Sequence, residues 1–117
     1  MIILKLPRRH RGAYLKYKEQ ARALVCERLA HLNQPYNFTY GRIAIRNTKT
    51  TWASCSKKGN LNFNYRVVYL GQDLLDYLIV HELCHLQEFN HSKRFWELVA
   101  RTVPDYKTLR RQLKQNF

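Results

Sequence analysis

Two histidines and a glutamate in the second half of the chain have the spacing of a metal site. The run His81-Glu82-Leu83-Cys84-His85 has the form H-E-x-x-H. In a helix, side chains four residues apart lie on one face, so both imidazoles can bind one tetrahedral Zn²⁺ ion at roughly 2.0–2.1 Å. Glu82, rotated by about 100°, can reach the open position of the metal without being a ligand. The motif therefore predicts that Glu82 acts as a general base on a zinc-activated water molecule.

A third histidine is a candidate to complete the ligand set, because two imidazoles leave zinc short of a protein ligand. His91 follows His85 by six residues and lies beyond Asn90, where the helix is expected to end. If the chain folds back after the helix, His91 becomes the third ligand of an open site. The other two histidines, His10 and His31, stand in basic or helix-end settings and are predicted to lie on the surface.

The alternative interpretation is that His81 and His85 are ordinary histidines of the hydrophobic core, because a lone H-E-x-x-H also occurs by chance. The segment from Gln72 to Glu88 contains no Gly or Pro and is apolar around most of the helical wheel, which is typical of a core helix. Polar side chains within such a helix need partners or a function. Three of the chain's five histidines also fall within eleven residues, so we favour the metal site.

The remaining segments predict the scaffold that positions these side chains. Asn60–Tyr65 alternates strictly between apolar and polar residues and follows a turn at Lys57-Lys58-Gly59, which predicts a hairpin with Thr51–Ser56. Phe95 and Trp96 are expected to pack behind the metal site and steady the His91 loop. We expect a single domain over 1–117, with a helix over about 12–32, a β region over about 38–65, the H-E-x-x-H helix over about 72–88 and C-terminal helices over about 92–117.

The composition predicts one small and strongly basic domain. The 117 residues include 21 Lys and Arg against 8 Asp and Glu, a formal net charge of +13. No apolar stretch is long enough to span a membrane, and three cysteines without a CxxC pair do not fit a disulfide framework. We therefore expect a cytoplasmic protein with no membrane partner, whose surface attracts polyanions, nucleic acid among them.

Two linked motifs carry a resemblance to a known family. The run from His81 to Trp96 reads HELCHLQEFNHSKRFW, and Thr51–Gly59 reads TWASCSKKG. From Arg42 onwards the chain resembles the YgjP-like metallopeptidase family, relatives of SprT-like and WLM proteases, although Ala53 stands where that family usually has Gly. The resemblance implies an α+β fold, a minimal zincin-like domain in which a small antiparallel sheet packs on a zinc-binding helix with flanking helices. It also implies that His81, His85 and His91 bind zinc and that Glu82 is the general base.

Three functions follow as hypotheses. The first is a zinc-dependent metallopeptidase that cleaves a peptide or protein substrate. The second is a metal-dependent hydrolase of nucleotide phosphoanhydrides, suggested by the cationic surface, although such substrates are better served by an oxygen-rich magnesium site. The third is a nucleic-acid-targeted protease or a basic DNA-binding module with a zinc site. A site of three histidines with a free Glu82 favours an enzyme, because structural zinc sites are usually closed by four protein ligands.

Overall fold

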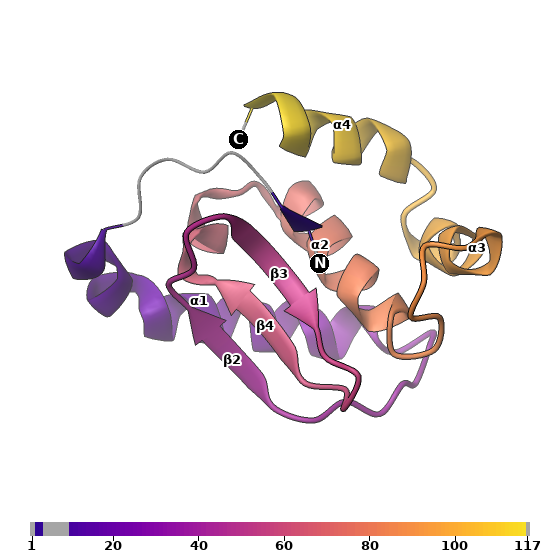
Figure 1. Ribbon diagram of the computed structural model, residues 1–117, viewed down its shortest axis with the longest axis horizontal. Helices are drawn as coiled ribbons and strands as arrows, with labels where there is room; N and C mark the ends of the chain where they lie inside the picture. The colour runs from indigo at the N-terminus through magenta and orange to yellow at the C-terminus, as the bar shows by residue number, and fades with distance from the viewer. Residues whose placement is uncertain (1, 4–9, 117) are drawn as a thin grey trace.

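A four-stranded sheet with helices packed against it makes up the fold (Figure 1), seen in a computed structural model that describes residues 2–3 and 10–116. The α+β class predicted from the sequence is confirmed. The limits predicted for the domain, residues 1 and 117, lie outside the described residues. The elements are β1 (Ile2–Ile3), α1 (Arg11–Leu32), β2 (Ile43–Arg46), β3 (Thr51–Cys55), β4 (Leu61–Asn64), the 3₁₀ helix η1 (Tyr65–Tyr69), α2 (Gln72–Cys84), α3 (Lys93–Thr102) and α4 (Tyr106–Asn116).

The sheet has the strand order β1-β3-β4-β2 and is mixed rather than wholly antiparallel. The predicted hairpin of β3 and β4 is confirmed, and Gly59 in its turn has the positive φ of 85° that glycine tolerates. β2, however, pairs with β4 in parallel. The reason is that β4 lies between β2 and β3 in the sheet, so β2 and β3 are not neighbours. Asn64, the last residue of β4, fastens the segment that connects β2 to β3, because its side-chain amide donates to the carbonyls of Thr48 and Thr51.

One face of this sheet forms the core together with α1 and α2. The pairings of Ile45 with Phe63 and of Ala53 with Phe63 place these side chains on the same face, and all three are buried. α1 packs on β2 and α2 packs on β3, so both helices cover this face. α2 is also in contact with α1, α3 and α4. The H-E-x-x-H helix is therefore the central element of the domain, as its apolar sequence predicts.

α2 ends at Cys84, four residues earlier than the sequence predicts. The backbone amides of Leu86 and Gln87 donate to the carbonyls of Leu83 and Cys84, which tightens the last turn to the 3₁₀ pattern. His85 is the C-cap of the helix, and a hydrogen-bonded turn follows it, in which the Glu88 amide still donates to the Cys84 carbonyl. The hydrophobic periodicity of the sequence continues through Leu86 and so does not predict this tightening. The tightened turn allows the following loop to turn back.

A bidentate ion pair ties α1 to α2. Arg28 donates to both carboxylate oxygens of Asp76 at 2.9 and 2.8 Å, and both side chains are less than one-fifth exposed. On the same helix, Arg22 donates to the carbonyl of Ile43 and thereby fastens α1 to β2. These contacts fix the position of α2, and with it the H-E-x-x-H motif, relative to the rest of the domain.

Two other observations bear on the sequence predictions. Within the described part of the chain, no helix has the length and apolarity required to cross a membrane. The three cysteines are free, with Cys84 buried and Cys26 exposed.

Replacing Asp76 by Asn should lower the free energy of unfolding by about 2 kcal/mol, because a charge-assisted bidentate contact between α1 and α2 is lost. Urea unfolding measures the change. The matched control is Glu19→Gln, which removes a carboxylate from a mostly exposed pair with Arg22 and should cost no more than about 0.5 kcal/mol. Equal losses in the two variants would contradict the role given to Asp76.

Candidate metal centre

The three candidate ligands come from the end of α2 and from the loop that follows it. His81 lies in the last turn of α2, His85 is the C-cap, and His91 stands directly before the cap of α3. That cap is Ser92, whose hydroxyl accepts a hydrogen bond from the backbone amide of Phe95. The start of α3 therefore fixes the loop at the position where His91 must point inward.

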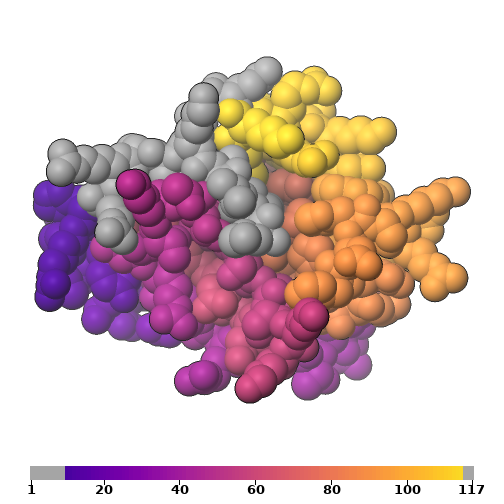
Figure 2. All heavy atoms as spheres, viewed as in Figure 1, coloured from indigo at the N-terminus to yellow at the C-terminus, as the bar shows by residue number. Residues whose placement is uncertain are grey.

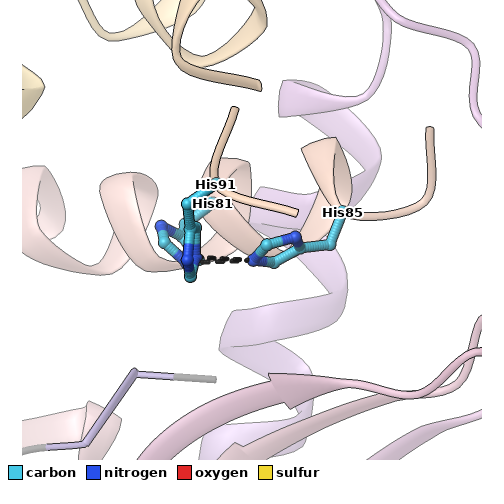
Figure 3. Close-up of side chains that lie close together, drawn as sticks. All are labelled: His81, His85 and His91. Atoms are coloured by element: carbon cyan, nitrogen blue, oxygen red, sulfur yellow. Dashed lines mark hydrogen bonds between the residues drawn. The ribbon is translucent and has the colours of Figure 1, made fainter. Parts of the chain in front are cut away.

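The imidazoles of His81, His85 and His91, called here the histidine triad, converge on one point (Figure 3). Their Nε2 atoms are 3.2 Å apart for His81 and His85, 3.0 Å for His85 and His91, and 3.2 Å for His81 and His91. Nitrogens bound tetrahedrally to one zinc ion at 2.0–2.1 Å lie about 3.3 Å apart. The triad thus has the spacing that a single ion requires, and the structure brings together the three histidines that the sequence singled out.

Desolvation favours the neutral, metal-binding form of these imidazoles, most strongly for His81 and His85, which are buried, and less for His91, which is exposed. Desolvation, helped by the two neighbouring histidines, lowers the pKa of His81 to about 2. Desolvation also lowers the pKa of His85 to about 4 and shifts the pKa of His91 downwards. A neutral imidazole offers one lone pair, and the partner of its other nitrogen decides which nitrogen carries that lone pair.

Two groups outside the triad orient its rings. Nδ1 of His85 lies 3.1 Å from the backbone carbonyl of Glu88, which can only accept, so Nδ1 donates and Nε2 keeps the lone pair. Nδ1 of His81 lies 3.4 Å from the buried hydroxyl of Tyr77. Tyr77 was missed by the sequence analysis, although its position four residues before His81 places it on the same face of the helix.

Aromatic rings enclose the triad on the side of α3. Phe95 is fully buried and stacks on His85 with ring centroids 4.4 Å apart. Trp96 is half-buried and stacks on His91 at 5.8 Å. The predicted packing of Phe95 and Trp96 behind the site is thus present, and it restricts how the His91 ring can move.

Glu82, between His81 and His85 on α2, carries a buried carboxylate. Its side chain is 0% exposed, and both carboxylate oxygens are without a hydrogen-bond partner within the described residues. Burial raises the pKa of Glu82 to about 7. It also raises the pKa of Cys55 on β3 to about 11, with the charge of Glu82 adding to the effect. An unpaired buried carboxylate is costly, and a cation or a water molecule held beside the triad would satisfy it. Both the ligand atoms and this carboxylate therefore fit a bound metal ion.

A cleft of about 450 Å³ reaches the triad at His85. One side is formed by the β3–β4 turn, including Ser56 and Gly59, and the other by the segment after α2, including Leu86 and Phe89. Phe89 is 47% exposed, so the cleft offers apolar as well as polar surface to a ligand. The arrangement places a cluster of histidines that could hold a metal ion next to an open cleft, which is the general form of a metallohydrolase site.

Comparison with known proteins assigns the chain to a family. The family described as "YgjP-like, metallopeptidase domain" matches residues 6–116. The chain therefore belongs to the YgjP-like metallopeptidase family, and this membership implies a bound metal ion. The match begins well before Arg42, where the sequence motifs start, so α1 is also part of the family's domain.

Two solved structures share the fold. The metallopeptidase zymogen abylysin of Pyrococcus abyssi has 27% sequence identity and a TM-score of 0.67, over 73% of this chain and 87% of that one. The metallopeptidase zymogen jannalysin of Methanocaldococcus jannaschii has 29% identity and a TM-score of 0.55, over 75% of this chain and 90% of that one. No protein with curated annotation shows significant similarity.

We predict that the protein binds one zinc ion per chain and that His91→Ala weakens binding more than about 100-fold, because a ligand is lost rather than a group that supports one. Elemental analysis and competition with a chelator give the two values. His31→Ala, which alters an exposed histidine on α1, is the matched control and should retain the metal. Retention of zinc by His91→Ala at unchanged affinity would remove His91 from the site.

Replacing Tyr77 by Phe should weaken zinc binding about 10-fold without unfolding the protein, because the hydroxyl that orients His81 is removed while the ring remains. Chelator competition measures the affinity, and circular dichroism checks the fold. Tyr69→Phe, which removes a hydroxyl from a side chain that is 51% exposed, serves as the control. Equal zinc affinities for Tyr77→Phe and the unaltered protein would show that Tyr77 does not position the ligand.

Proposed function

We propose that this protein is a zinc-dependent peptidase in which the histidine triad holds the metal and Glu82 is the general base. The observation that carries the proposal is the convergence of three imidazole nitrogens, combined with the fully buried, unpartnered carboxylate of Glu82, the residue that follows His81 in the sequence. Three nitrogen ligands that leave a coordination position open are the donor set of catalytic zinc sites. The description of both similar structures as metallopeptidase zymogens supports peptide bonds as the target.

The chemistry divides between the ion and the side chains of this chain. A zinc ion in such a site polarises the scissile carbonyl and increases the acidity of a water molecule. Glu82 accepts a proton from the attacking water and passes it to the leaving amine, which restores the carboxylate for the next cycle. The carbonyl of Glu88 keeps the lone pair of His85 directed into the site, and the hydroxyl of Tyr77 can accept a hydrogen bond from Nδ1 of His81 and so do the same for that residue. The cleft beside His85 receives the peptide chain.

The nucleotide hydrolase considered from the sequence has less support. Polyphosphate substrates are usually processed with magnesium, which prefers oxygen ligands. Within the described residues, the one side-chain cluster that could hold a metal ion consists of three histidines. Nitrogen ligands favour zinc over magnesium, and the peptidase is therefore the function that this site supports best.

Replacing Glu82 by Gln should preserve zinc binding and lower peptidase activity at least about 100-fold, because the amide cannot accept the proton of the attacking water. New amino termini released from an unfolded protein substrate measure the activity. Glu97→Gln, which alters an exposed carboxylate on α3, is the matched control and should retain activity.

Two further results make this test specific. Glu82→Gln should not lower the free energy of unfolding, because a neutral amide is cheaper to bury than a carboxylate. Zinc-loaded Glu82→Gln protein that cleaves at the rate of the unaltered protein would contradict the general-base role.

A further inference from the structure

A second concave surface lies between α3 and α4, and the described residues that line it are all aromatic or cationic. The residues are Trp96 of α3 and Tyr106, Lys107, Arg110, Arg111 and Lys114 of α4, around a volume of about 460 Å³. We refer to this surface as the α3–α4 groove. Figure 2 shows α3 in orange beside α4 in yellow on one face of the molecule. The volume falls within the usual range of ligand-binding sites.

The four cations of the α3–α4 groove have no ionic partners within the described residues, where the ion pairs are Arg22–Glu19 and Arg28–Asp76. Two carboxylates lie nearby in the sequence, Glu97 on α3 and Asp105 just before α4, but neither lines the groove. Like charges gathered on a concave surface focus their field and raise the local concentration of anions. The positive charge of the groove therefore favours a negatively charged ligand.

The α3–α4 groove begins one side chain away from the histidine triad. The guanidinium carbon of Arg110 lies 5.3 Å from the centre of the Trp96 ring, and that ring stacks on His91 at 5.8 Å. An extended peptide advances roughly 3.3 Å per residue, so about three residues suffice to connect the triad to Arg110. The cleft touches the triad at His85, which means that a chain passing the triad could occupy both surfaces.

We propose that the α3–α4 groove binds an acidic segment of the polypeptide substrate and so selects peptides with carboxylates a few residues from the scissile bond. The selection of substrates rests on the function proposed above, whereas binding of the acidic segment does not require turnover. Arg110 and Arg111 are specificity-determining residues in this proposal, because a guanidinium can hold a carboxylate through two parallel hydrogen bonds. The net charge of +13 attracts such substrates from a distance.

An acidic peptide fits the α3–α4 groove better than a single-stranded nucleic acid does. Proteins that bind single strands offer open aromatic faces on which bases stack. The Trp96 ring is already engaged, since Tyr106 stacks on it at 4.9 Å with an angle of 15° and Arg110 lies over it. An acidic peptide needs only cations from the groove, and it can also extend to the proposed peptidase centre. It therefore fits the groove better than a nucleic acid does.

The test measures binding without cleavage, using zinc-loaded Glu82→Gln protein with fluorescein-labelled octaglutamate and octaglutamine. At about 50 mM salt, fluorescence anisotropy should show octaglutamate binding at least 10-fold more tightly. Adding Arg110→Gln and Arg111→Gln together should weaken octaglutamate binding about 5-fold. The matched control is Lys16→Gln with Lys49→Gln, which removes the same charge from exposed positions on α1 and the β2–β3 connection and should change binding less than 2-fold.

Three outcomes would overturn the proposal: equal losses in the two double variants, equal binding of octaglutamate and octaglutamine, or tighter groove-dependent binding of an octathymidylate strand. The last would assign the groove to nucleic acid instead. Cleavage of paired peptides that differ only in Glu or Gln completes the test, and the unaltered protein should prefer the acidic member. Groove-dependent binding of octaglutamate with no peptide cleaved would contradict the proposed function while supporting the acidic-peptide site. Cleavage without groove-dependent binding would contradict the groove alone.

Discussion

The burial of ionisable side chains in the last turn of α2 is the constraint on which this structure depends. His81, Glu82 and His85 are at most 5% exposed, in a helix whose other buried residues are mostly apolar. Removing such groups from water is unfavourable unless their polar atoms find partners. The fold supplies partners for the outer nitrogens of the two histidines and leaves their Nε2 atoms directed at a common point. A metal ion bound at that point would provide the partner that these nitrogens lack and would offset the cost of their burial.

The scaffold places the remaining parts of the centre around this turn. β3 packs on α2 and brings Cys55 near Glu82, while the β3–β4 turn forms one side of the cleft. The early end of α2 gives the chain room to reverse, and the cap at Ser92 holds the reversed segment so that His91 faces His85. Phe95 then closes the apolar side of the triad. α2, β3, the β3–β4 turn and the start of α3 thus each contribute a ligand or a contact to the surroundings of the histidine triad.

The charge of the protein is distributed in a way that relates to this centre. Within the described residues, the carboxylate in the centre is buried and two others pair with arginines on α1, while four cations of α4 gather along one groove. Trp96 contacts both the triad and that groove, and so connects the candidate metal site to a cationic concave surface. In the proposal made above, this neighbouring surface is what makes the peptidase selective for acidic substrates.

The sequence by itself determined the candidate metal ligands and the local elements. The H-E-x-x-H spacing predicted the histidine pair, because i, i+4 geometry is a property of any helix. Strict alternation predicted β4 and its hairpin with β3, and Gly59 predicted the turn, because these signals are also local. Only the tertiary structure decided that β4 inserts beside β2 in parallel, that α2 stops at Cys84, and that Trp96 borders the cationic groove of α4. These features depend on contacts between residues distant in the chain, such as the hydrogen bond from the Asn64 amide to the Thr48 carbonyl. Hydrophobic periodicity is a local property of the sequence, and it does not predict which distant residue a side chain will contact.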